Sequence, residues 1–322
     1  MEIVTADIGG THARFAIARM DGEQVVELGE PVTLKTADFA SLQTAWEAFG
    51  AQLGRALPCA AGIAIATPIT GAALKLTNNP WVIHPAQLPA QLGLDRHVLV
   101  NDFGAVGHAV ASLPADQFRH LAGPDQPLPE TGVISVIGPG TGLGVASVVR
   151  AAGHYHVIET EGGHVEYPAL DSIEDAILGR LRRQFIRVSA ERVVSGPGLA
   201  AIYQSLAALE GRPVAEPGDA QLWASALDGS DSLAAAAFER FCLSFGTVAG
   251  DIVLAQGGKA LVIAGGLGLR IADRLGQSGF AMRFAAKGRF RHLMESIPVR
   301  IITHAQPGLY GAAAAFAREF KP

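Results

Sequence analysis

Residues 2–18 read EIVTADIGGTHARFAIA, and residues 132–149 read GVISVIGPGTGLGVASVV. Each stretch contains an apolar run, a glycine-rich turn that includes Gly-Thr, and a second apolar run, which is the pattern of a β-hairpin. The Gly-Thr pairs begin at positions 10 and 140, so the two stretches repeat at a spacing of 130 residues. An internal repeat of this kind indicates a fold built from two similar halves.

Apolar periodicity outside the repeat predicts further strands and helices. Continuous apolar runs favour strands at 60–67, 97–100, 260–264 and 299–303. Helical spacing of apolar residues favours helices at 42–53, 107–112, 173–185, 199–209, 220–227, 233–254 and 309–320. We therefore expect an α/β protein whose second half is the more helical, with a first crossing between domains near 112–116.

The composition excludes several classes of protein. A chain of 322 residues is about twice the usual domain size, which favours two domains. With 49% apolar and 17% charged residues the chain is too apolar to be disordered, and a net charge of −5 offers no basic surface for nucleic acid. The 38 glycines, about 12% of the chain against a typical ~7%, call for a structural explanation.

The sequence also predicts where the protein resides. Two uncharged runs, 56–74 and 131–149, are long enough to cross a bilayer, but proline and glycine interrupt both, so we expect strands and turns there. The N-terminus has no basic residues before its apolar stretch, which argues against a secretory signal. Cys59 and Cys242 lie in apolar surroundings and are expected to be buried free thiols. The sequence thus predicts a cytoplasmic protein with no membrane partner.

Three glycine-rich turns follow apolar runs, at Gly9–Thr11, Gly138–Gly144 and Gly265–Gly268. Because glycine has no Cβ, the backbone N–H groups of such turns can approach a phosphate closely. A plain turn explains any one of them, but three together favour phosphate binding. The Walker loop is excluded because Gly258-Lys259 is followed by alanine, and the dinucleotide fingerprint is excluded because its third glycine is missing.

Two acidic positions stand at the ends of predicted strands. Asp7 directly precedes the first glycine turn, where its carboxylate favours a nucleotide that carries Mg²⁺ over a bare phosphate. Asn101 and Asp102 follow the run 97–100, at the strand end where α/β folds place ligands. Asp102 suits a general base that accepts a hydroxyl proton, but Asn-Asp also suits the N-cap of a following helix. Both interpretations stay open at this stage.

Glu161 and His164 flank Gly162-Gly163, a turn that can direct both side chains to one small ligand. Together with His154 and His156 they form a conceivable metal site. No cysteine pair accompanies them, however, and a solvated strand face explains the two histidines better.

The remaining charged residues have ordinary interpretations. From its surroundings alone, Glu191 has the pattern of an exposed helical glutamate. The basic cluster is interpreted as a solvated face rather than a binding patch, and it consists of Arg283, Lys287, Arg289 and Arg291.

In their order and spacing, these motifs resemble those of the bacterial glucokinase family, of the type outside the ROK group that enteric bacteria and alphaproteobacteria carry. The resemblance covers essentially the whole chain. It rests on Asp7-Ile-Gly-Gly-Thr11, Asn101-Asp102-Phe103, Gly138–Gly144, Glu161-Gly-Gly-His164-Val165, Ser189–Val193, Ser195-Gly-Pro-Gly198 and Ala264-Gly-Gly266, with further matches at Lys287–Phe290, Ile297–Val299 and Gln306–Leu309. Two departures stand out. His12 replaces the asparagine that commonly follows Gly-Gly-Thr, and the cysteine-rich zinc motif of ROK kinases is absent, so no zinc site is expected.

The resemblance implies an actin-like, ribonuclease-H-like fold with a small α/β domain (1–112 plus 307–322), a large α/β domain (113–306) and an interdomain cleft. It implies a glucokinase that phosphorylates D-glucose at O6 with MgATP, as a homodimer in the cytoplasm, with Asp102 as general base. The implied sugar contacts are Asn101, Asp102, Glu161, His164 and Glu191. The implied nucleotide contacts are Asp7, Gly9, Gly10, Thr11, Gly140, Thr141, Gly142, Gly265 and Gly266, with Asp7 serving Mg²⁺ through water or the nucleotide.

Two other classes of function fit the sequence less well. A non-catalytic sugar sensor is expected to carry a DNA-binding segment before the first glycine turn, and only six residues precede Asp7. An actin-like ATPase has no use for the set Glu161, His164 and Glu191. The sequence therefore favours a hexose kinase.

Overall fold

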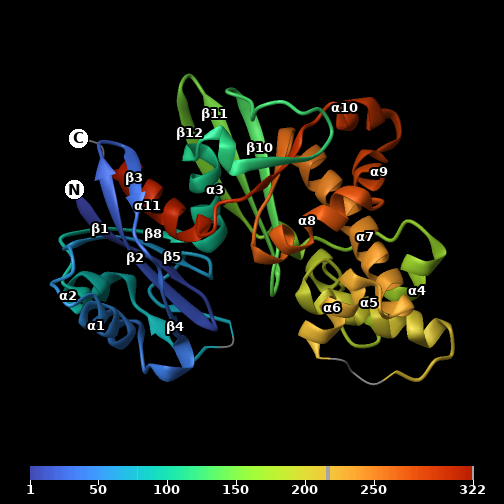
Figure 1. The fold of residues 1–322 in the computed structure, drawn as a ribbon, viewed down its shortest axis with the longest axis horizontal. Helices are drawn as coiled ribbons and strands as arrows, with labels where there is room; N and C mark the ends of the chain where they lie inside the picture. Colours follow the sequence, from blue (N-terminus) through green and yellow to red (C-terminus); the bar gives the residue numbers. More distant parts are fainter. Residues whose placement is uncertain (78, 215–217, 321–322) are drawn as a thin grey trace. The chain divides into compact units, whose positions relative to one another are not determined.

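The structure, a computed structural model, describes residues 1–77, 79–214 and 218–320 (Figure 1). Its internal contacts divide the chain into two compact units. Unit 1 contains Met1–Pro114, Val157–Glu159 and His304–Pro322, and unit 2 contains Ala115–His156 and Thr160–Thr303. The domain boundaries after residues 112 and 306 stay predictions, and positions 321–322 of the small domain lie outside the described residues.

A six-stranded sheet forms the centre of unit 1, with the strand order β3-β2-β1-β5-β8 and with β4 also paired to β2. β1 and β2 form the antiparallel hairpin that the first glycine turn predicts, while β5 runs parallel to β1 and β8 parallel to β5. A separate two-stranded sheet joins β6 and β7. The strands are β1 (Glu2–Ile8), β2 (His12–Asp21), β3 (Gln24–Leu28), β4 (Val32–Lys35), β5 (Ala60–Ile65), β6 (Leu74–Lys75), β7 (Val82–Ile83) and β8 (Arg96–Asn101).

Helices cover both faces of this sheet because successive side chains of its central strand point to opposite faces and both sets are apolar. Val4 of β1 packs in the cluster that contains Trp46 of α1 (Leu42–Leu53). Ile3 packs instead with Phe316 of α11 (Pro307–Glu319). The short α2 (Leu88–Leu92) joins the first cluster, and α3 (Asp102–Ser112) packs beside α11.

The sheet of unit 2 repeats this topology. Its order is β12-β11-β10-β13-β14-β9, and the antiparallel hairpin of β10 and β11 is followed by the parallel strands β13 and β14. The hairpin β1–β2 followed by β5 and β8 has the same arrangement in unit 1, so the predicted internal repeat is confirmed. The strands are β9 (Phe118–Ala122), β10 (Gly132–Pro139), β11 (Leu143–Ala151), β12 (His154–Thr160), β13 (Gly258–Ile263) and β14 (Val299–Ile302).

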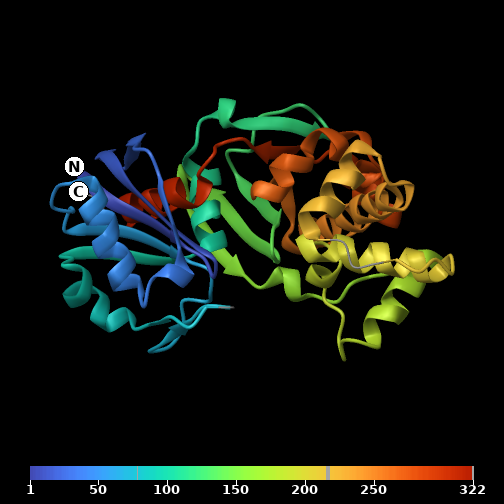
Figure 2. The same cartoon turned by 60° about the horizontal axis from the view of Figure 1, so that its bottom comes forward.

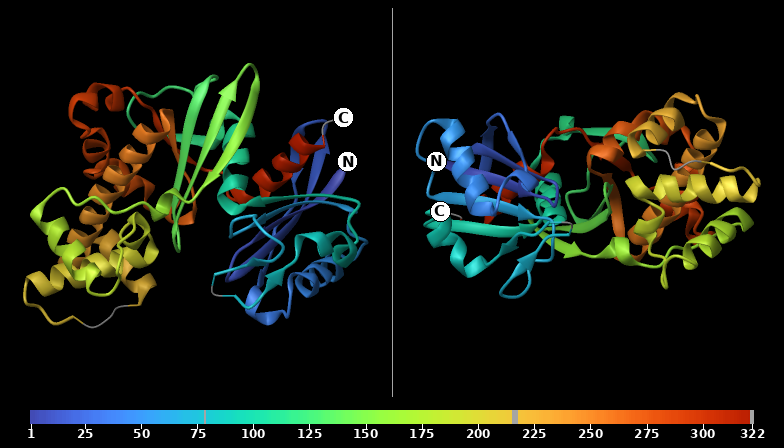
Figure 3. Two further views of the ribbon diagram at one scale, coloured as in Figure 1. Left: turned by 180° about the vertical axis from the view of Figure 1, so that it is seen from behind. Right: turned by 90° about the horizontal axis from the view of Figure 1, so that it is seen from below.

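Seven helices of the described residues belong to unit 2. Figures 2 and 3 show the same ribbon from other directions. The longest of these helices, α7, contributes Phe241 and Phe245 to a buried aromatic cluster with edge-to-face and tilted ring contacts, which also includes Trp223 and Phe280. The helices are α4 (Ser172–Arg182), α5 (Gly196–Leu209), α6 (Asp219–Asp228), α7 (Ser232–Gln256), α8 (Gly266–Gln277), α9 (Phe280–Ala285) and α10 (Arg291–Glu295). Within the part of the chain that the structure describes, no helix has both the length and the apolar character needed to cross a bilayer.

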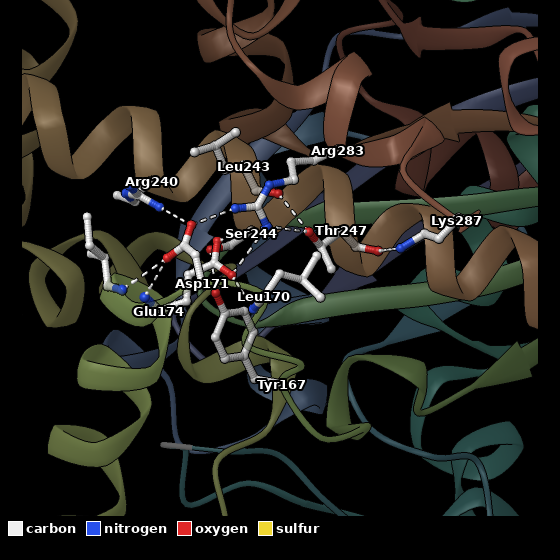
Figure 4. A network of polar contacts seen from close by, with 11 residues as sticks. Tyr167, Leu170, Asp171, Glu174, Arg240, Leu243, Ser244, Thr247, Arg283 and Lys287 are labelled. Atoms are coloured by element: carbon white, nitrogen blue, oxygen red, sulfur yellow. Dashed lines mark hydrogen bonds and ion pairs between the residues drawn. The ribbon is translucent and has the colours of Figure 1, made fainter. Parts of the chain in front are cut away.

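A network of ion pairs in unit 2 corrects the interpretation of the basic cluster (Figure 4). Arg283 of α9 is only 12% exposed and pairs with Asp171 at 2.8 Å and with Glu174 at 3.2 Å. Lys287 is 8% exposed and pairs with Asp251 at 2.7 Å. These two cations are therefore not a solvated face, because acidic residues far away in the sequence lie against them. Arg289 and Arg291 are exposed, as predicted.

The stretch 107–112 lies in a helix, as predicted, and this helix begins at Asp102 because Asn101 caps it there. One smaller expectation is wrong. Cys59 is exposed, since it lies in the bend before β5 rather than inside the strand, whereas Cys242 is buried as predicted. Both thiols are free.

Candidate active site

Backbone and side-chain contacts hold the first glycine turn in unit 1 in place. Thr36 Oγ1 donates to the Gly10 carbonyl at 2.8 Å, and Asn79 Nδ2 donates to the same carbonyl at 3.1 Å. A Cβ at Gly10 would run into the carbonyl oxygen of Thr77. Glycine at this position is thus required by the close approach of two backbones, and the turn is fixed before any ligand binds.

Asp7 lies near the end of β1, opposite Arg14 on β2, with 3.5 Å between Oδ2 and the guanidinium. Its side chain is 23% exposed, and a Cβ at Gly308 would stand 2.9 Å from Oδ2, so the carboxylate lies against the first turn of α11. Burial raises the pKa of Asp7 above its ordinary value even though Arg14 acts in the opposite direction. The negative charge of Asp7 is therefore only partly compensated by the protein itself.

Asn101 and Asp102 stand at the carboxyl end of β8, an edge strand of the sheet in unit 1. Asn101 is the N-cap of α3, since its Oδ1 accepts the N–H groups of Phe103 at 2.9 Å and Gly104 at 3.3 Å. Asp102 is the first residue of the helix, half-buried, and its Oδ1 accepts the N–H of Phe103 at 2.8 Å. The structure gives the capping role to Asn101, so capping does not explain the carboxylate of Asp102.

The second and third glycine turns lie side by side in unit 2. Gly140-Thr141-Gly142 joins β10 to β11, with a hydrogen bond of 2.8 Å from Gly140 N to Gly142 O. Gly265, whose φ of +86° favours glycine, precedes α8, and a Cβ there would stand 3.3 Å from the Pro139 carbonyl oxygen. Gly196, at the start of α5, donates its N–H to Gly140 O at 2.7 Å. The N-termini of two helices therefore adjoin this turn, which favours an anion.

Glu161 precedes a short 3₁₀ turn, η4 (Gly162–His164), and His164 is its last residue. The turn packs against β11. A Cβ at Gly163 would run into the Leu143 carbonyl oxygen, so the glycine permits this close contact. The main-chain N–H of the same Leu143 donates to Glu191 Oε2 at 2.9 Å. Leu143 is thus the point where the turn of Glu161 and His164 meets Glu191.

Two short backbone pairings maintain this arrangement. Ala190 N donates to Val165 O at 2.8 Å, and Tyr167 N donates to Val188 O at 3.1 Å. They join the chain that follows His164 to η5 (Ala190–Arg192), which carries Glu191. The expected sugar contacts therefore fall into two groups in the structure: Asn101 and Asp102 in unit 1, and Glu161, His164 and Glu191 in unit 2.

A pocket in unit 2 joins the second glycine turn to Glu191. Thr141 of the turn, Glu191 and Arg192 of η5, and Pro197 and Ala200 of α5 line it. Arg192 also lies over the ring of Phe185, 4.1 Å from its centroid. Thr141, a candidate contact of the nucleotide, and Glu191, a candidate contact of the sugar, thus line the same pocket.

The alternative of a metal site among the histidines gains no support. His154 and His156 are exposed on β12. In the ranges 1–77, 79–214 and 218–320, no group of three or more His, Cys, Asp or Glu side chains is arranged to hold a metal ion.

Glu191 is the candidate that residue-level reasoning alone would miss. The structure shows a half-buried side chain on a 3₁₀ turn rather than an exposed helical glutamate, and its partner Leu143 is 48 residues away in the sequence. No local pattern encodes that pairing. Only the order of motifs along the chain points to Glu191.

Comparisons with known proteins agree with this geometry. A family model described as Glucokinase matches residues 4–319. A glucokinase of Zymomonas mobilis is 58% identical over 320 residues, 99% of each chain, and one of Paramagnetospirillum magneticum is 42% identical over 97% of this chain and 96% of its own. The crystal structure of a glucokinase from an Antarctic psychrotroph superposes with a TM-score of 0.85 at 33% identity, covering 98% of this chain and 99% of its own.

More distant structures share the fold. A ROK family glucokinase from Streptomyces griseus, in complex with glucose and AMPPNP, has a TM-score of 0.65 at 17% identity over 99% of this chain and 100% of its own. This chain has two glycine-turn hairpins, and parallel strands follow each of them. Together with the similar structures, this topology defines a sugar kinase of the actin-like α/β fold, as the family resemblance implies. Within that class, the chain belongs to the bacterial glucokinase family.

Proposed function

We propose that this chain transfers the γ-phosphoryl group of MgATP to O6 of D-glucose, with Asp102 as the general base. Family membership makes it an ATP-dependent hexose kinase that phosphorylates glucose. The observation that carries the assignment of the base is the start of α3: Asn101 caps the helix, and Asp102 follows it in the first turn at the end of a strand. A carboxylate there can accept the hydroxyl proton as the oxygen attacks phosphorus.

The sugar is held by hydrogen bonds from Asn101, Asp102, Glu161, His164 and Glu191. Carboxylates accept from hydroxyl groups, while the amide and the imidazole can both donate and accept, so the set can read several hydroxyls at once. The complexes of related kinases with glucose support this ligand. The Leu143 N–H that fixes Glu191 and the glycine at 163 keep the unit 2 members of the set in place.

The nucleotide phosphates bind at the glycine turns, with contacts from Gly9, Gly10 and Thr11, from Gly140, Thr141 and Gly142, and from Gly265 and Gly266. The ATP analogue in the related Streptomyces griseus complex supports ATP as donor. In unit 2 the adjoining N-termini of α5 and α8 add favourable potential for phosphate charge. Positioning and charge stabilisation of this kind supply most of the rate in phosphoryl transfer.

Asp7 fits the Mg²⁺ that accompanies ATP. Mg²⁺ is commonly held by one or two carboxylates together with phosphates and water, so a single aspartate beside a phosphate turn is sufficient. Burial raises the pKa of Asp7, which leaves a carboxylate whose charge a cation would compensate. Asp7 would hold the metal directly or through water, and the bound metal would neutralise charge on the phosphates.

We expect the protein to work as a homodimer in the cytoplasm, as the family resemblance implies. Light scattering after size-exclusion chromatography tests the oligomeric state: a mass of twice 33.5 kDa supports the dimer, and a single-chain mass contradicts it.

Substitution Asp102→Asn tests the proposed base in a coupled assay of ADP release. Because the amide cannot take the proton, turnover should fall by about 10²–10⁴-fold while the dissociation constant for glucose stays within about tenfold. Running the assay with glucose, fructose, mannose and N-acetylglucosamine identifies the sugar. Near-native turnover by the variant would refute the role of Asp102, and ADP release that needs no sugar would refute the kinase assignment.

A further inference from the structure

One acidic side chain that has no role in the site above contacts the start of α3. Glu159 lies near the end of β12, and its Oε1 accepts the main-chain N–H of Asn101 at 2.8 Å. Val157–Glu159 belongs to unit 1, as do Asn101 and Asp102. The hydrogen bond therefore reaches the backbone from which both residues project.

Gly104 leaves the space that this carboxylate occupies. A Cβ at Gly104 would run into Glu159 Oε1 and would come within 2.8 Å of its Cγ and Cδ. Glycine is otherwise unfavourable inside a helix. Its place in the first turn of α3 is thus explained by the approach of Glu159, and any side chain at 104 would push the carboxylate away.

Asn101 is held on two sides. Its side chain serves α3 as the N-cap, and its Nδ2 donates to Thr67 O at 3.3 Å. Its main-chain N–H donates to Glu159, and Asn101 itself is only 9% exposed. A charged acceptor makes a stronger hydrogen bond than a neutral one, and a carboxylate is favourable at a helix N-terminus. Glu159 therefore fixes the direction in which β8 turns into α3.

We propose that Glu159 is a positioning residue for phosphoryl transfer: it holds the backbone of Asn101 so that Asn101 and Asp102 present their side chains to the sugar. This role rests on the proposed functions of those two residues. Glu159 acts through the main chain of Asn101 and takes no proton from the sugar.

Three variants test the proposal: Glu159→Ala removes the acceptor, Glu159→Gln keeps an acceptor oxygen without the charge, and Gly104→Ala displaces an intact Glu159. For Glu159→Ala and Gly104→Ala, we expect kcat/KM for glucose to fall by about tenfold, as for the loss of one charge-assisted hydrogen bond. Glucose affinity measured by calorimetry without nucleotide should weaken as well, while KM for MgATP stays within about twofold. Glu159→Gln, which keeps a neutral acceptor, should recover part of the loss.

Two matched controls separate this effect from general damage. Glu47 is an exposed glutamate of α1 that accepts one hydrogen bond, from Gln43 at 3.0 Å, and Glu47→Ala should leave kinetics unchanged. Gly179 lies in α4 with no atom within 4 Å of a Cβ, so Gly179→Ala controls for placing alanine in a helix. Thermal unfolding of every variant shows whether the protein remains folded.

Several results would overturn the proposal: kcat/KM for glucose within about twofold of the parent in Glu159→Ala and Gly104→Ala, equal losses in Glu159→Gln and Glu159→Ala, or a lower Tm with unchanged kcat/KM. Asp102→Asn in the same assay keeps the two claims distinguishable. Near-native turnover of that variant refutes the general base, whereas the calorimetric affinity for glucose judges Glu159 independently of turnover.

Discussion

Gly163 shows how one residue fixes the place of a side chain that we propose to bind the sugar. Its missing Cβ lets the turn that carries His164 lie directly on the Leu143 carbonyl, while the N–H of Leu143 holds Glu191. We expect Gly163→Ala to push the turn off β11, to raise KM for glucose about tenfold or more, and to destabilise the fold by about 1–3 kcal/mol. Steady-state kinetics and urea unfolding measure both effects. An unchanged KM would show that the turn can move without displacing His164.

At the residue scale, the sequence predicts which side chains have suitable chemistry better than it predicts which residues they hydrogen-bond. It places Asp102 at a strand end but leaves the roles of general base and helix cap open. The structure assigns the N-cap to Asn101, and the general base stays a prediction. The sequence likewise marks Glu161 and His164 by their glycine turn, a local signal. Glu191 has no such signal, since its hydrogen-bond partner comes from a distant strand.

At the element scale, the contact of α3 with α11 contains a histidine that makes stability depend on pH. Burial, together with Arg318, lowers the pKa of His108 from 6.5 to about 4. Above pH 6.5 the residue is neutral in both the folded and the unfolded chain. Between pH 6.5 and about 4 only the unfolded chain takes up the proton, so this stability is lost as the pH falls, by up to about 3 kcal/mol.

Urea unfolding at several pH values between 7 and 4.5 measures this loss. His108→Gln has no titrating group at this position, so its unfolding free energy should fall less steeply with pH than that of the parent. Parallel slopes for the two proteins would show that His108 titrates alike in the folded and unfolded states.

The ion pairs that join α4, α7 and α9 form a second stabilising element (Figure 4). Glu174 is fully buried and faces Arg283, so removing the cation leaves an uncompensated charge in the interior. We expect Arg283→Met to destabilise the protein by about 3–5 kcal/mol, and Glu174→Gln added to it to restore part of the loss. Chemical unfolding of both single variants and of the double variant checks this coupling. Strict additivity would refute it.

At the scale of the whole molecule, the sequence predicts the repeated hairpins and the parallel strands because their signals are local: apolar runs, glycine turns and their spacing. The register of β1 on β2 and of β10 on β11 follows from those turns. Long-range placement has no such signal. That residues 157–159 join unit 1, or that acidic partners lie against Arg283 and Lys287, depends on packing between segments that are far apart in the sequence.

Each unit has its own apolar core, with one large cluster around α7 in unit 2 and others around β1 in unit 1. We therefore expect calorimetric unfolding to depart from a single two-state transition. Residues proposed to contact glucose belong to each of the two units, so glucose should raise the free energy of unfolding of the unit that unfolds first, by about 2.7 kcal/mol at a hundred times its dissociation constant. Glu191→Gln, which weakens the proposed contacts in unit 2, should reduce that shift. If Glu191→Gln left the shift unchanged at the same glucose concentration, Glu191 would not contact glucose and the proposed set of five sugar-binding residues would be wrong.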